Sequence, residues 1–272
     1  MRFYLILFLL LRLLFAGESN QWHSHSAHLI TKQRWEIGLF QPLRYGLSSD
    51  LEYSTHPLWF FVMPNVSIKK AHEDRGSTKR ASRISIVYPT PILNMLSNEG
   101  IGGLIDPNIT MPPMLGVSGS FLMSWDAFGV MVTSKTGIDL GLTMGELDTR
   151  SNIDLPLVYH RLEVFHNKWG VHAGLDLTKD ITRHIQLLVD LDVRLLPGLE
   201  KRKEDQSYQM HSGNHSIEHK LLLIWNRSSR FRIITGYKLV RGDFPHGNET
   251  RLLPYVPMLE KWVPILELQW AK

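Results

Sequence analysis

The chain of 272 residues contains no cysteine at all. Exported proteins that need covalent cross-links use disulfides, so this chain must be stabilised either by a large core or by a membrane. Beyond the first sixteen residues it also lacks any apolar run that approaches the roughly 18 residues of a spanning helix. These two absences exclude a disulfide-framework domain and a helical membrane protein.

A block of like charge is also missing. The formal net charge of +4 falls to +2 when Arg2 and Arg12 are removed together with the N-terminal segment. The most basic stretch, KRKED at residues 201–205, has its acidic residues immediately after the basic ones. Such a stretch is typical of a solvated loop, and we therefore expect no nucleic-acid partner.

The N-terminus has the layout of a secretory signal peptide. Arg2 supplies a short positive region, residues 3–15 form an apolar run broken only by Arg12, and Ala16 and Gly17 supply small residues for cleavage. We predict a signal peptide over residues 1–16, and therefore an exported protein. The roughly 256 residues that remain suit one large domain.

Residues 17–33 are polar and contain His23, His25 and His28 in the pattern H-x-H-x-x-H. Imidazole is a common ligand of transition metals, but the segment has no carboxylate or thiolate to complete a site. We therefore predict a flexible polar leader, with neither a metal nor a cofactor, that precedes a single domain over residues 34–272.

The domain is dominated by a two-residue period. In HIQLLVDLDVRLL, residues 184–196, apolar residues occupy the odd positions and mostly polar residues the even ones, as on a β-strand with one apolar face. The same alternation returns in about a dozen segments, many of 9 to 12 residues, mostly joined by short turns. The fold class predicted is all-β, a single up-and-down antiparallel transmembrane β-barrel of about 12 strands.

Three features favour lipid on the apolar face. The segments are long enough for a tilted crossing, which takes about 9–11 residues. The polar face is rich in Gly and Ser with mixed charges, which suits a narrow lumen. Aromatic residues lie near the strand ends, as in interfacial girdles: Trp35, Tyr45, Trp125, Trp169, Trp225, Trp262 and Trp270. The residues predicted to face lipid in the segment quoted above are Leu187, Val189, Leu191 and Val193.

Charged residues on the opposite face are predicted to point into the lumen. Their signs nearly balance, which favours pairing inside a narrow barrel, with residues 91–114 folded into its mouth. The predicted lumen-facing residues are Glu36, Arg44, His172, Asp176, Asp190, Asp192, Arg194, Glu218, Lys238 and Glu267.

In its signal peptide, two-residue period, aromatic belts and final amphipathic strand, the chain resembles the bacterial outer-membrane β-barrel proteins over essentially the whole mature length. It departs from that class in its ending, because Trp270 is followed by Ala271 and Lys272 rather than closing the chain. The resemblance implies an outer-membrane location, membrane lipid and the barrel-insertion machinery as partners, and a role as a narrow channel or structural scaffold without catalytic residues. No feature of the sequence specifies an oligomeric state.

Two alternatives stay open. A soluble periplasmic lipocalin-like barrel would use the same alternation turned inside out, with Leu187, Val189 and Leu191 lining a cavity for an apolar ligand. A barrel-embedded lipid hydrolase would need a serine and a histidine base, and MHSGNHS supplies His211 and Ser212. Adjacent residues in a glycine-containing loop do not hold a nucleophile and its base in place, so the hydrolase is the weakest of the three.

Overall fold

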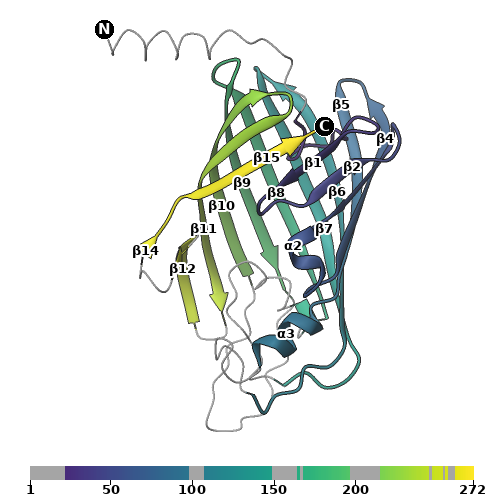
Figure 1. The fold of residues 1–272 in the computed structure, drawn as a ribbon, viewed down its shortest axis with the longest axis vertical. Coiled ribbons are helices and arrows are strands. Elements are labelled where there is room, and N and C mark those ends of the chain that lie inside the picture. Colours follow the sequence, from purple (N-terminus) through teal and green to yellow (C-terminus); the bar gives the residue numbers. More distant parts are fainter. Residues whose placement is uncertain are drawn as a thin grey trace.

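The computed structural model describes residues 22–97, 107–148, 164–165, 168–196, 215–244, 247–253, 255–256 and 261–272. The predicted signal peptide and His211 and Ser212 lie outside these residues. Strands dominate the described chain and form one closed antiparallel barrel (Figure 1). None of the described helices is long and apolar enough to cross a membrane. The predicted all-β barrel is confirmed.

The strands lengthen and shorten again along the chain. They are β1 (Trp35–Gly38), β2 (Leu43–Gly46), β3 (Leu51–Thr55), β4 (Asn65–Arg75), β5 (Thr78–Val87), β6 (Met114–Ala127), β7 (Val130–Thr143), β8 (Trp169–Asp180), β9 (Ile185–Leu195), β10 (His215–Ser228), β11 (Phe231–Phe244), β12 (Gly247–Leu253), β13 (Tyr255–Val256), β14 (Lys261–Trp262) and β15 (Ile265–Ala271). The short helices α2 (Pro57–Phe60) and α3 (Thr90–Leu96) lie in connections.

Each strand from β1 to β11 pairs antiparallel with the next, and β15 closes the barrel. Trp270 of β15 pairs with Phe231 of β11 on one side and with Ile37 of β1 on the other. The rest of β11 pairs with β12. The strands β12 and β15 therefore share the position of a twelfth strand, interrupted by the small hairpin of β13 and β14.

The two ends of the barrel differ in their connections. Tight turns join β4 to β5, β6 to β7, β8 to β9 and β10 to β11 at one end, here called the turn end, where the C-terminus also lies (Figure 1). At the β6–β7 turn, Phe128 and Gly129 both have positive φ, as a two-residue hairpin requires. The long connections, including α3, lie at the opposite end, here called the loop end.

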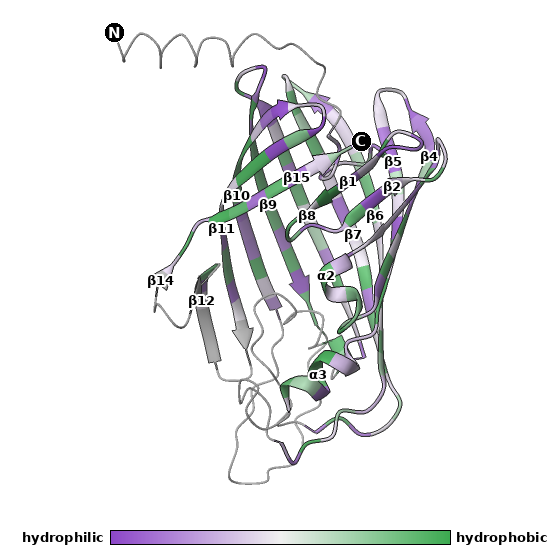
Figure 2. Cartoon of the chain, viewed as in Figure 1, coloured by the Kyte–Doolittle hydropathy of each residue, from purple (hydrophilic) through white to green (hydrophobic). Residues whose placement is uncertain are grey.

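The two faces of the wall have opposite character. Side chains that point inward include buried polar groups such as Ser124 and Thr133, whereas Ile84 and Leu142 are more than half exposed on the outside. Hydrophilic and hydrophobic residues alternate along the strands (Figure 2). The wall therefore presents an apolar surface outward and a polar surface to the lumen, which is the arrangement of a membrane barrel.

Candidate functional site in the barrel lumen

The structure places the predicted charged residues on the inner face of the wall. Six of them are less than a tenth exposed although they carry charge: Glu36, Arg44, Asp176, Asp190, Glu218 and Glu267. The other four are partly buried: Asp192, Arg194 and Lys238 make ion pairs there, and His172 makes a hydrogen bond to Asp139. Burial of charge is costly unless each charge has a partner, so these contacts determine what the lumen can do.

An acid–base network spans β7 to β10. The ammonium of Lys135 lies 2.8 Å from Asp176, 3.0 Å from Asp190 and 2.8 Å from Asp192. Lys220 of β10 contacts the other oxygen of Asp190 at 2.5 Å. Two lysines thus neutralise three carboxylates on the inner face.

Further along the same wall the pairing continues towards β11. Arg194 lies 3.1 Å from Asp139, and His172 contacts the same carboxylate oxygen at 2.9 Å. Lys238 lies 2.6 Å from Glu218. Charged side chains therefore form a continuous belt across five neighbouring strands.

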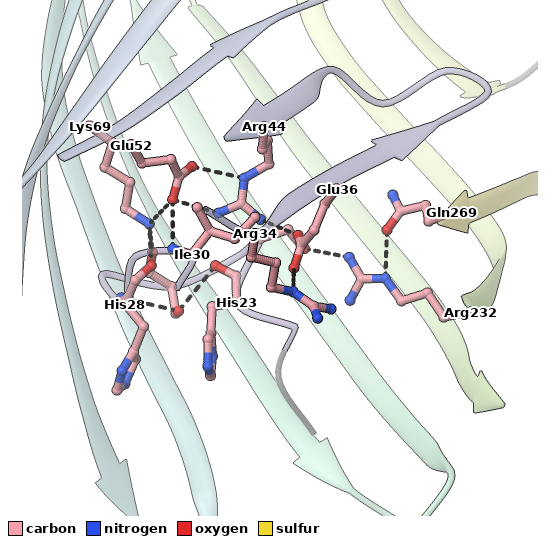
Figure 3. Close-up of polar contacts among 12 residues, drawn as sticks. His23, His28, Ile30, Arg34, Glu36, Arg44, Glu52, Lys69, Arg232 and Gln269 are labelled. Atoms are coloured by element: carbon pink, nitrogen blue, oxygen red, sulfur yellow. Dashed lines mark hydrogen bonds and ion pairs between the residues drawn. The ribbon is translucent and has the colours of Figure 1, made fainter. Parts of the chain in front are cut away.

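A second charged cluster lies on β1 to β4 (Figure 3). Arg44 bridges Glu36 and Glu52, with 2.8 Å between nitrogen and oxygen on each side. Lys69 of β4 stands 4.0 Å from Glu52. All four are buried, and Lys69 is only 2% exposed. This cluster lies beside the leader.

The described part of the leader is residues 22–33, of which residues 22–30 are buried or partly buried inside the barrel and residues 31–33 are exposed. Lys69 donates hydrogen bonds to the carbonyl oxygens of Ser26 at 2.7 Å and His28 at 2.5 Å. Glu52 accepts one from the backbone N–H of Ile30 at 3.1 Å. The sequence analysis expected a flexible segment, but Ser26 is fully buried. That expectation is wrong for residues 22–33, because the barrel wall supplies partners to their backbone.

Other wall residues hold the beginning of the leader. Two guanidinium groups lie over the ring of Trp22. The Cζ atom of Arg232 is 4.2 Å from the ring centroid, and the Cζ atom of Arg34 is 5.2 Å from it. Arg232 also donates to the hydroxyl of Ser24 at 2.8 Å. Ser124 of β6 accepts a hydrogen bond from the N–H of Ala27 at 2.7 Å. Strands β3, β4, β6 and β11 thus all contact the leader.

The leader histidines are neutral in this environment. The rings of His23 and His28 stack with centroids 5.1 Å apart. Burial, the adjacent His28 and the cations Arg44 and Lys69 lower the pKa of His23 to about 4. Burial lowers the pKa of His28 as well. Among the described residues, no cluster of three or more His, Asp or Glu side chains has the arrangement of a metal site.

The loop end is filled by apolar side chains. Ile92 and Leu93 of α3 are buried against Met63, Met111 and Met114, together with Val164 and Phe165. The described parts of residues 91–114 therefore contribute buried apolar side chains to a cluster at the loop end.

The residues predicted to face lipid lie on the outer face. Leu191 is 44% exposed, and Leu187, Val189 and Val193 are partly exposed. Between them, Leu188 and Asp190 are almost completely buried on the inner face. A soluble lipocalin-like barrel needs the opposite orientation, with Leu187, Val189 and Leu191 inside.

Sequence reasoning missed an apolar patch on the inner face. Leu188, Leu222, Ile224 and Ile234 are buried together there, with Ile265 packed against them. These residues occupy positions that the two-residue alternation assigns to the inner, mostly polar face. The alternation therefore predicts that they point inward, but it does not predict that they contact one another.

No protein-family model matches the chain, and no curated protein matches it. Among solved structures, the chain is similar to the outer membrane channel DcaP of Acinetobacter baumannii, with a TM-score of 0.39 and 8% sequence identity. The alignment covers 85% of this chain and 62% of that one.

Proposed function

We propose that the protein is an outer-membrane barrel that acts as a narrow channel and is held closed by its own leader. The observation that carries this proposal is the leader inside the lumen, bound through Lys69, Glu52, Ser124 and Arg232. Most of these contacts are to backbone groups or hydroxyls of the leader, and none is covalent. A segment held in this way can leave without chemical change to the wall.

The membrane location rests on the two faces of the wall. Many exposed outer positions carry Ile, Leu and Phe side chains, while charged residues such as Glu36, Lys69 and Asp190 are buried on the inner face. Open apolar surface of this extent belongs in contact with lipid rather than water. The partners proposed are therefore outer-membrane lipid along the wall and the insertion machinery that would assemble the barrel, with β15 as the final strand.

Planar-bilayer recording tests the channel role. The full chain is expected to show little current, whereas a variant that lacks residues 22–33 is expected to conduct. Gel mobility with and without heating verifies that both proteins are folded. Ion flow through the deleted variant should depend on salt and pH, because the exposed wall carries Lys69, Glu52 and Arg232.

A permanently filled scaffold is the second candidate function. The apolar cluster around Ile92, Leu93 and Met111 at the loop end and the ion pairs of Lys135 in the middle favour it. If the folded, leader-deleted barrel conducts no more than the full chain, the channel proposal fails and the scaffold remains.

A further inference from the structure

Three residues on the inner face form a hydrogen-bonded chain that the channel role does not require. The Nε2 atom of His172 on β8 lies 3.0 Å from the hydroxyl oxygen of Ser120 on β6. The Nδ1 atom of the same ring lies 2.9 Å from a carboxylate oxygen of Asp139 on β7. A nucleophile within hydrogen-bond reach of a base, with the base oriented by an acid, is the arrangement of a hydrolytic triad.

The sheet register builds this chain. Ser120 pairs with Gly137 across β6 and β7, and Gly137 pairs with His172 across β7 and β8. Gly137 has no side chain, so the imidazole can cross over β7 and reach Ser120. A Cβ atom at position 137 would lie 2.4 Å from the Nε2 atom of His172, closer than any normal contact. Glycine is therefore required at this point of close approach.

The contacts also select a tautomer of the ring. A carboxylate only accepts hydrogen bonds, so Asp139 accepts from the Nδ1–H of His172. The Nε2 atom then carries the lone pair and accepts from the Ser120 hydroxyl, as a general base must. Arg194 donates to the same Asp139 oxygen at 3.1 Å and holds this carboxylate charged and in place.

A further cation flanks the nucleophile. Arg83 on β5 pairs directly with Ser120, and both residues belong to the inner face. The row Arg83, Ser120, Gly137, His172 and Arg194 thus runs across five strands at one level. Cationic groups at this level favour negative charge as it develops on a substrate oxygen.

We propose that Ser120, His172 and Asp139 are a catalytic triad that hydrolyses small carboxylic esters inside the barrel. The hydroxyl oxygen of Ser120 bonds to the carbonyl carbon while its proton moves to His172. The ester C–O bond breaks, and the alcohol leaves with that proton. Water then adds to the acyl-serine, gives a proton to His172, and releases the carboxylic acid as Ser120 recovers its proton.

Covalent labelling tests the nucleophile directly. The full-length barrel, folded in detergent, is incubated with a fluorophosphonate probe or with the smaller phenylmethylsulfonyl fluoride, and modified peptides are mapped by mass spectrometry. The adduct is expected on Ser120. Turnover of p-nitrophenyl acetate is expected to fall at least about a hundredfold in Ser120→Ala, His172→Ala and Asp139→Asn, because triad members act as a unit.

Ser85→Ala is the matched control. Ser85 lies on the inner face of β5 and bonds to the hydroxyl of Ser67 at 2.5 Å, without contact to the triad. Its loss should change neither labelling nor turnover. The same assays are repeated on the barrel that lacks residues 22–33. Labelling that appears only after this deletion means that the leader blocks access to Ser120, whereas no labelling in either protein means that Ser120 is unreactive.

If neither reagent modifies Ser120 in the folded full-length or leader-deleted protein, the triad proposal is wrong. It is equally wrong if Ser120→Ala hydrolyses the ester as fast as the unaltered chain. These measurements involve no current and no bilayer. Their failure would therefore leave the channel proposal intact, and a non-conducting barrel would leave the triad intact.

Discussion

The ammonium of Lys69 on β4 binds the carbonyl oxygen of Ser26 at 2.7 Å, although 43 residues separate them in the chain. Lys69 is almost completely buried, and the nearest carboxylate in an ion pair with it, that of Glu52, is 4.0 Å away. The leader thus satisfies a buried cation through backbone oxygens. The wall and the leader stabilise each other, so weakening one side of this contact should release the other.

Lys69→Met is expected to loosen the leader. Hydrogen bonds to a charged group contribute about 1.5–3 kcal/mol each, so loss of the two bonds should raise exposure of the leader at least about tenfold. The measurement is the rate at which a hydrophilic maleimide labels the variant Ser26→Cys, whose position is fully buried in the intact barrel. The chain has no natural cysteine, so every label reports this position.

Lys70→Met is the control for that change. Lys70 is the next residue on β4 and lies on the exposed outer face. The Lys70→Met substitution removes the same charge at a position that does not contact the leader. Equal labelling rates in the two methionine variants would contradict the anchoring role of Lys69.

Acidification is expected to release the leader. The pKa of His23 is lowered to about 4 from 6.5, so the docked state disfavours the protonated ring. Stability of docking is therefore complete above about pH 6.5 and is lost as the pH falls towards 4. Labelling of Ser26→Cys should accelerate over this interval. Burial also lowers the pKa of His25, to about 3. The triple variant His23→Gln, His25→Gln, His28→Gln should therefore lose most of the acceleration, and a wild-type rate that does not change with pH would refute the linkage.

Asp190→Asn should destabilise the folded barrel by about 1.5–3 kcal/mol, because it weakens charged hydrogen bonds to two partly buried lysines while Asp176 and Asp192 still neutralise Lys135. Asp190 contacts Lys135 at 3.0 Å and Lys220 at 2.5 Å. Chemical unfolding in lipid vesicles measures the change. Asp74→Asn is the comparison, since the ion pair of Asp74 with Lys79 is exposed and should contribute about 0–1 kcal/mol. Similar losses in the two variants would show that the lumen network is as well hydrated as the surface.

The sequence predicts the barrel and the face of each strand because side-chain alternation is a local property. It does not predict the docked leader, since its anchors Lys69 and Arg232 lie far away in the chain and no short pattern marks them. For the same reason Leu188 can be placed on the inner face but not in contact with Ile234.

The proposed triad has no motif in the sequence, because its residues are spread over three strands. The tight turn at Phe128 and Gly129 nevertheless carries the information. Ser120 and Gly137 are equally distant from this turn, so they must pair. Aligning the two strands of this hairpin about its turn would have shown a serine paired with a glycine on the polar face, which leaves room for a side chain from the next strand. Reaching His172 would also require the register of the next pair, where the connection from β7 to β8 is long.

Single cysteines at positions 187 through 194 test the orientation of the whole wall. Leu187, Val189, Leu191 and Val193 should be quenched by lipid-soluble probes, since they lie on the outer face. Cysteines at the inner positions 188 and 190 should resist hydrophilic maleimides in the full chain, because Leu188 and Asp190 are 1% and 2% exposed in a filled lumen. Val189→Lys should cost about 2–4 kcal/mol if it lies near the bilayer midplane, and less towards the interfaces. Quenching without a two-residue period, or hydrophilic labelling of the odd positions, would overturn the assignment of this face to lipid.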